Sequence, residues 1–299
     1  MPYGHITAAV RALRPCAPAT MARRAASQLA QIEAGLAKAQ PVRTGDRSSI
    51  VAAVLRQPHV RPHPRGDGHS SHPQGLDCLF ILRSSDPQGS RWSGQVAFPG
   101  GHVEEGESDL EAVARECREE VGLHLDAPGH YRCIGRVSPE MLYGDAFFAL
   151  PLRYRLALCL TPQRCTQVAD RSVYRSEKQS SLLVRCYVFE QLIHEPMTAD
   201  PAEVAACGWT PLDALLHDDL IVPLPAVVGG DDPLWSGFAS VPLPITDDDM
   251  ALPVGREMSK ADCRARFALW GLTLSICNDW LTSCEMRRHA IALPKQAAI

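Results

Sequence analysis

The sequence predicts an α/β fold, because runs with the pattern of strands and runs with the pattern of helices both recur along it. Residues 48–55 and 76–82 are short, apolar and rich in β-branched or aromatic side chains, which is typical of buried strands. Residues 109–122 and 267–281 repeat apolar side chains every three or four positions, which is typical of helices that bury one face. We therefore expect strands and helices to share a core.

The composition is that of an ordinary globular protein. Of the 299 residues, 45% are hydrophobic and 21% are charged, which excludes a chain disordered throughout. The formal net charge of −4 gives no overall basic field, so we expect no nucleic-acid partner. No apolar run reaches the roughly 18–20 residues that span a bilayer, so we expect a soluble protein without a membrane partner. The eleven cysteines form no CxxC pair, which predicts reduced thiols.

The N-terminal segment is basic and rich in alanine. It contains Arg11, Arg14, Arg23 and Arg24, and the first acidic residue is Glu33. This is the composition of a mitochondrial presequence. A poorly ordered or amphipathic N-terminal helix in alanine- and arginine-rich sequence is the alternative. We expect an intracellular protein, in mitochondria or in the cytoplasm.

One domain is expected from residue 46 to residue 285. An extension at 1–45, the possible targeting segment, precedes it, and a tail at 286–299 follows it. Stretches near 161–181 and 223–253 are polar or rich in proline, glycine and aspartate, so we expect them to be insertions into this domain.

Three further segments are assigned from local pattern. Residues 182–190 are expected to form a strand, and residues 210–216 a short helix after Trp209. The proline-rich stretch 57–74 is expected to be a solvated loop. Its histidines have no cysteine or carboxylate at metal-ligand spacing; they are His59, His63, His69 and His72.

A strand, a turn and a helix are expected between residues 96 and 122. The sequence QVAFPGG ends the strand in a tight turn. The helix is expected to begin after an N-cap at Ser108 or Asp109 and to end at Gly122. Its expected buried stripe consists of Leu110, Val113, Cys117 and Val121.

Three glutamates crowd together on this helix. Glu116, Glu119 and Glu120 stand at positions i, i+3 and i+4, so they lie on one side of the helix. Each such pair of like charges costs a few tenths of a kcal/mol. A bound divalent cation would compensate for this cost, because hard cations such as Mg²⁺ bind carboxylate oxygens together with substrate phosphates. A solvated acidic helix face is the alternative.

The residues around these glutamates follow a fixed order. It reads Gly101, five residues, Glu107, seven residues, Arg115-Glu116-Cys117, one residue, Glu119-Glu120, one residue and Gly122-Leu123. This order resembles the signature of the Nudix hydrolase family at every fixed position. The resemblance implies a Nudix α/β/α sandwich with a mixed β-sheet, in which the signature forms a catalytic loop-helix-loop.

The same resemblance implies a role for each signature residue. The metal ligands would be Glu116, Glu119, Glu120 and the carbonyl of Gly101, and the ion would be Mg²⁺, with Mn²⁺ as the alternative. The structural residues would be Gly101, Glu107, Arg115 and Gly122, with Glu107 paired to Arg115 so that the loop is held against the helix.

The hydrolysis also needs a base that takes a proton from water. Glu119 and Glu120 are candidates within the signature. Glu203 is a candidate outside it, because it stands where many Nudix proteins keep a functional glutamate, and Glu140 is another. Exposed loop carboxylates without a catalytic role are the alternative for the last two.

The stretch 79–101 resembles the segment that precedes the signature in coenzyme A pyrophosphatases. The matching residues are Arg83, Ser84, Arg91, Gly94, Phe98 and Pro99. The spacing from Arg91 to Gly94 is one residue shorter than in that subfamily. Arg83 and Arg91 are the expected substrate-binding residues, because guanidinium groups make bidentate contacts with phosphates. For Arg91, a surface residue without a role in binding is the alternative. Residues 267–281 resemble the Trp-Gly-x-Thr helix that ends many domains of this type.

The expected function is Mg²⁺-dependent hydrolysis of a pyrophosphate bond in a small nucleotide-type substrate. Coenzyme A, cleaved to 3′,5′-ADP and phosphopantetheine, is the first candidate. Other nucleoside diphosphate derivatives or modified nucleoside triphosphates are the second. A catalytically silent Nudix fold that acts as a binding module is the third, although no signature glutamate is lost. The sequence does not predict the oligomeric state.

Overall fold

The computed structural model describes residues 18–37, 47–58, 75–85, 93–137, 141–143, 182–223, 239–255 and 258–287. Most of the histidine-containing loop, the first expected insertion and much of the second lie outside these residues. Arg91 and Glu140 lie outside them as well.

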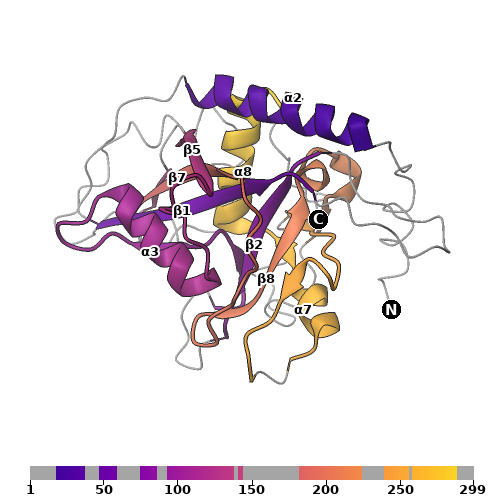
Figure 1. The fold of residues 1–299 in the computed structure, drawn as a ribbon. Helices are drawn as coiled ribbons and strands as arrows, with labels where there is room; N and C mark the ends of the chain where they lie inside the picture. The colour runs from indigo at the N-terminus through magenta and orange to yellow at the C-terminus, as the bar shows by residue number, and fades with distance from the viewer. Residues whose placement is uncertain are drawn as a thin grey trace, which may run out of the picture.

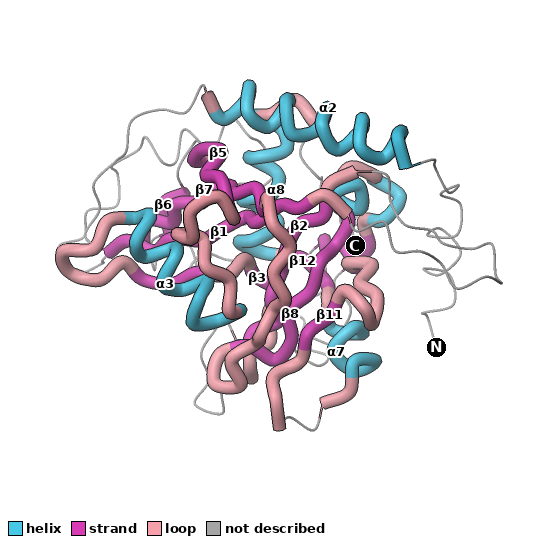
Figure 2. The backbone as a smooth tube through the Cα atoms, in the orientation of Figure 1, coloured by secondary structure: helices cyan, strands magenta, loops and turns pink. Residues whose placement is uncertain are grey.

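The centre of the described part of the chain is a nine-stranded mixed sheet (Figures 1 and 2). Its main path is β11-β8-β2-β1-β7-β5, while β3, β4 and β6 pair with β2, β1 and β7. β1 and β7 are parallel, and the other pairs are antiparallel. The strands are β1 (Arg47–Arg56), β2 (Asp77–Arg83), β3 (Val96–Ala97), β4 (Gly100–His102), β5 (Tyr131–Arg136), β6 (Met141–Tyr143), β7 (Leu182–Gln191), β8 (Val204–Pro211) and β11 (Met250–Ala251).

A smaller sheet and the helices complete the described part. The smaller sheet has the order β12-β10-β9. These strands are β9 (Val222–Pro223), β10 (Ala239–Pro242) and β12 (Ala268–Leu269). The α-helices are α2 (Pro18–Leu36), α3 (Asp109–Val121), α7 (Lys260–Arg266) and α8 (Gly271–Ser283), and the 3-10 helices are η2 (Leu212–Leu215) and η3 (Asp218–Leu220).

The main sheet buries both of its faces. Successive residues of β2 alternate between two hydrophobic clusters, as the two-residue period of a strand requires. Leu79 and Ile81 join the cluster that contains the buried residues of α3. Phe80 and Leu82 join the cluster that contains residues of α2 and α8. Figure 1 shows α3 on one side of the strands and α8 on the other. The predicted α/β class with a mixed sheet is confirmed.

Helix α2 is packed into the protein. Ala25, Ile32 and Leu36 are buried in the same cluster as α8. The amide of Gln28 donates to Asp213 Oδ1 at 2.9 Å, and its carbonyl oxygen accepts from Leu76 N–H at 2.7 Å. The helix is therefore amphipathic, as one alternative for the N-terminal segment expects. Its use as a targeting signal stays a prediction. No helix of the described part is long and apolar enough to cross a membrane.

The structure corrects the expected helix at residues 210–216. Thr210 pairs with Cys78 of β2, so β8 continues to Pro211. Only Leu212–Leu215 is helical, as a short 3-10 turn.

The C-terminal helix also begins later than predicted. Ala268–Leu269 pairs with β10, and α8 starts at Gly271. In both corrected segments, pairing with a distant strand outweighs the local helical pattern.

Candidate active site

Helix α3 has well-defined caps. The Ser108 side chain accepts from Glu111 N–H, and the Glu111 side chain accepts from Ser108 N–H, which forms a capping box. Gly122 ends the helix in the left-handed conformation at φ 72°. Both predicted ends are confirmed. The predicted stripe is confirmed at Val113, Cys117 and Val121, which are buried. It is wrong at Leu110, which is 48% exposed, and α3 buries Ala112 and Ala114 in its first turns instead.

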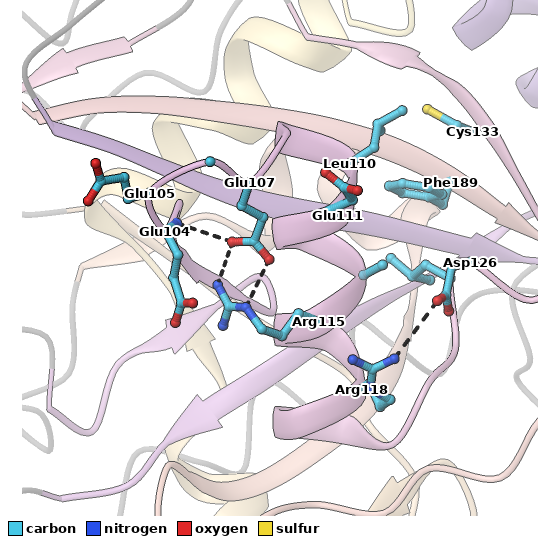
Figure 3. A pocket seen from close by; sticks show the side chains of 13 residues that line it. Glu104, Glu105, Glu107, Leu110, Glu111, Arg115, Arg118, Asp126, Cys133 and Phe189 are labelled. Carbon is cyan, nitrogen blue, oxygen red and sulfur yellow. Dashed lines mark hydrogen bonds and ion pairs between the residues drawn. The ribbon is translucent and has the colours of Figure 1, made fainter.

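Glu107 and Arg115 fasten the loop before α3 to the helix. The Arg115 guanidinium donates to both carboxylate oxygens of Glu107 at 3.0 Å, and to the carbonyl of His102 at 3.0 Å. Figure 3 shows this fork-to-fork contact within the groove that the loop and α3 line. The hydrogen bond from Arg115 lowers the pKa of Glu107, and the same bond raises the pKa of Arg115. Two charged side chains thus fix the loop between β4, which contains Gly101, and α3.

On another side of α3, three carboxylates meet. Oxygen atoms of Glu116, Glu120 and Glu203 all lie within 4.8 Å of one another. The Glu120 side chain is 1% exposed and that of Glu116 is 13% exposed. Glu120 Oε2 accepts from Gly100 N–H at 2.8 Å, and Glu120 Oε1 lies 3.5 Å from Arg83 Nη1. The backbone before α3 therefore orients the most buried carboxylate.

This arrangement raises the pKa of the two carboxylates on α3, Glu116 and Glu120. Burial raises the pKa of Glu120 to about 8, partly offset by the Gly100 N–H, while Glu116 and Glu203 raise it further. Burial also raises the pKa of Glu116. A divalent cation would compensate for the repulsion among these groups, and three convergent carboxylates are the donors that Mg²⁺ or Mn²⁺ prefers. The residues present therefore fit the metal that the signature implies.

Glu119 lies apart from this cluster. Its side chain is 58% exposed, and Arg115 Nη1 donates to it at 3.2 Å. Positions 116 and 120 are one turn apart and face the sheet, whereas position 119 faces solvent. The sequence grouped Glu119 with the other two glutamates, while the structure brings Glu203 to them.

Glu203 reaches the cluster through the loop before β8. Thr198 N–H donates to Val121 O at 2.9 Å, and Asp200 N–H donates to Glu120 O at 3.0 Å, so this loop is tied to the C-terminal end of α3. The Glu203 carbonyl accepts from Ser84 N–H at 2.8 Å. The Glu203 side chain is exposed and borders the two buried carboxylates.

Arg83 is the expected substrate-binding residue that the structure describes. It ends β2, and its side chain is 32% exposed next to Glu120. The Arg83 guanidinium, the loop before β8 and the group of three carboxylates thus lie at the same end of the sheet.

Comparison with known proteins identifies the family. The model of the NUDIX domain matches residues 71–227, slightly more than half of the chain. The chain belongs to the Nudix family. It is accordingly a pyrophosphohydrolase of a family that acts on nucleoside diphosphate derivatives and uses divalent metal ions. The predicted family and reaction class are confirmed.

Solved structures of other Nudix proteins resemble the chain weakly. RenU, a Nudix hydrolase from M. smegmatis, is 13% identical over 58% of this chain and 75% of that chain, with a TM-score of 0.33. The NUDIX domain of Shewanella oneidensis NrtR, complexed with ADP ribose, is 17% identical over 60% and 83%, with a TM-score of 0.31. A MutT NUDIX hydrolase from Burkholderia pseudomallei is 22% identical over 56% and 84%, with a TM-score of 0.26. Scores this low add nothing to the family assignment.

Proposed function

We propose that this Nudix hydrolase cleaves the pyrophosphate bond of coenzyme A, with Mg²⁺, to give 3′,5′-ADP and phosphopantetheine. The observation that carries the proposal is the group of Glu116, Glu120 and Glu203 next to Arg83. This group supports hydrolysis of a dense anion, and the residues from Arg83 to Pro99 that resemble coenzyme A pyrophosphatases support the choice of substrate.

The proposed metal ligands are Glu116, Glu119, Glu120 and the Gly101 carbonyl. When bound, the ion neutralises the pyrophosphate and lowers the pKa of a coordinated water. Glu120 is held by Gly100 N–H, so its carboxylate is oriented before any substrate arrives. Glu119 has to leave Arg115 to act as a ligand, which Arg115 tolerates because Glu107 still pairs with it.

We propose Glu203 as the general base. Glu120 is a poor candidate, since it is buried and already accepts a hydrogen bond from Gly100 N–H. Glu203 is exposed beside the two buried carboxylates, where a water bound between them and the substrate would be within reach. In the reaction, the water oxygen forms a new bond to one phosphorus, and the bond from that phosphorus to the bridging oxygen breaks. The bridging oxygen leaves with the second phosphate, and one proton of the water passes to Glu203.

Arg83 is proposed to contact the substrate phosphates. Its guanidinium lies beside the carboxylates, with a third of the side chain exposed. It can therefore remain in contact with Glu120 or turn to an arriving phosphate, with which it forms charge-assisted hydrogen bonds. Arg91 has the same proposed role.

A second substrate class is supported by one observation. The spacing from Arg91 to Gly94 is one residue shorter than in coenzyme A pyrophosphatases. This departure favours another nucleoside diphosphate derivative or a modified nucleoside triphosphate. The intact signature opposes the silent binding module.

A substrate panel tests the proposal. The purified chain is incubated with coenzyme A, ADP-ribose and nucleoside triphosphates in Mg²⁺, in Mn²⁺ or in EDTA, and products are separated by chromatography. We expect 3′,5′-ADP from coenzyme A with either metal and none in EDTA. Glu120→Gln and Glu116→Gln should each reduce turnover strongly. Faster turnover of another substrate than of coenzyme A would overturn the proposed specificity.

A further inference from the structure

A second arginine lies beside the segment that follows Arg83, although it comes from a part of the chain far from the signature. Arg266 ends α7, and its Nη2 atom lies 3.5 Å from Ser85 Oγ. Ser85 belongs to the segment that leaves β2 directly after Arg83. The neighbouring Ser84 N–H donates to the Glu203 carbonyl at 2.8 Å. Arg266 therefore borders the same end of the sheet as Arg83 and Glu203.

Gly94 provides the space for this guanidinium. A β-carbon at Gly94 would lie 3.0 Å from Arg266 Nη2, and the residue has φ +69°, which favours glycine. The turn that contains Gly94 is joined to β2, because Arg83 N–H donates to the Gln95 carbonyl at 2.9 Å. The absence of a side chain at Gly94 thus lets Arg266 approach the segment that carries Arg83.

Arg266 differs from several other arginines of the protein, because their charges are paired with carboxylates. Arg264, two residues earlier on α7, forms an ion pair with Asp247. Arg115 and Arg132 likewise pair with glutamates. Within the described part of the chain, Arg266 has no carboxylate partner, and its side chain hydrogen-bonds to the Ser85 hydroxyl. A guanidinium in this setting is suited to bidentate binding of a phosphate.

The position of Arg266 indicates which phosphate it would take. Arg83 contacts Glu120 directly, so it is the arginine beside the proposed metal ligands. Arg266 is separated from them by Ser84 and Ser85, which suits a phosphate that is not cleaved. Coenzyme A carries such a group on its ribose, outside the scissile pyrophosphate.

We propose that Arg266 binds the 3′-phosphate of coenzyme A and makes the enzyme specific for substrates with this additional phosphate. The inference rests on the proposed function. It gives α7, a helix outside the signature, a direct part in substrate choice.

The test compares two probes that differ only in this phosphate. Values of kcat and KM are measured with Mg²⁺ for coenzyme A and for 3′-dephospho-coenzyme A, in the wild type, Arg266→Met, Arg266→Lys and Arg264→Met. We expect the wild type to prefer coenzyme A in kcat/KM. Arg266→Met should reduce this preference by about 10- to 100-fold, mainly through KM, as loss of a charge-assisted hydrogen bond predicts. Arg266→Lys should retain part of it, and Arg264→Met should retain all of it.

Two results would overturn the inference in distinguishable ways. If the wild type cleaves both probes and Arg266→Met leaves the preference unchanged, or Arg264→Met reduces it equally, the role of Arg266 is wrong while the proposed function stands. If the wild type cleaves neither probe, the proposed function is wrong, and the assignment of Arg266 to this phosphate is wrong with it. Thermal unfolding of each variant identifies any loss that comes from misfolding.

Discussion

The Glu116 carboxylate occupies the space that a side chain at Gly101 would fill. A β-carbon at position 101 would lie 2.3 Å from Glu116 Oε1, well inside contact distance. Because Gly101 has no side chain, the Glu116 carboxylate of α3 can approach the backbone of β4. A side chain at position 101 would therefore displace a proposed metal ligand.

Gly101→Ala should therefore impair the proposed metal site without unfolding the protein. The new methyl group displaces Glu116, and we expect Mn²⁺ affinity or kcat/KM to fall by about 10- to 100-fold, as for other changes that misplace a ligand. Gly129→Ala is a suitable control, because its β-carbon meets nothing within 4 Å while its φ of +77° adds backbone strain. Equal losses in the two variants would contradict the steric argument.

The sequence predicted those parts of the fold that depend on near neighbours. The caps at Ser108 and Gly122 follow from residue types close in the chain. The pairing of Glu107 with Arg115 across one loop was implied by the resemblance to the Nudix signature, and the structure contains it. The strands at β1 and β7 follow from continuous apolar runs.

The sequence did not predict the parts of the fold that depend on contacts between segments far apart in the chain. β8 contains Gly208 and Pro211, which are poor strand residues, and it forms because β2 lies beside it. The approach of Glu203 to Glu120 requires this pairing, and the approach of Arg266 to Ser85 requires the packing of α7. Sequence could place Glu203 near the site only through its position in the family pattern, and it gave no signal for Arg266.

The stability of the metal-free protein should depend on pH through Glu120. Its pKa of about 8 in the folded protein lies above the ordinary value of 4.5, so the unfolded chain loses this proton first as pH rises. Folding stability from this group is therefore present below about pH 4.5 and is lost progressively up to about pH 8.

Glu120→Gln removes this dependence, because glutamine stays neutral and can still accept from Gly100 N–H. We expect the Tm of the variant in EDTA to rise relative to the wild type between pH 5 and pH 8. Thermal unfolding at several pH values measures the difference, and parallel curves would contradict it. Added Mg²⁺ should stabilise the wild type more than the variant at pH 8, because binding to the folded state raises stability.

Helix α2 should contribute to the stability of the whole domain. Ile32 is fully buried against the cluster that includes α8, and its carbonyl lies 3.7 Å from Cys284 Sγ. Ile32→Ala is expected to reduce the free energy of unfolding by about 2–5 kcal/mol, from lost burial and the cavity that remains. Gln31→Ala, at an exposed position of the same helix, is the matched control. Denaturant unfolding with equal midpoints for both variants would show that α2 packs too weakly to matter.

Glu203→Gln and Glu116→Gln should lose activity for different reasons. If Glu203 is the base, its variant binds Mn²⁺ nearly as well as the wild type but loses about 10²- to 10⁴-fold in kcat, together with the acidic limb of the pH–rate profile. Glu116→Gln removes a ligand, so it weakens Mn²⁺ binding itself, measured by electron paramagnetic resonance without substrate. Oxygen atoms of the two residues lie within 4.8 Å of each other, which makes the comparison a test of role at nearly the same position. A loss of Mn²⁺ affinity in Glu203→Gln as large as that in Glu116→Gln would identify Glu203 as a ligand, and the base would then have to be sought at Glu119 or Glu140.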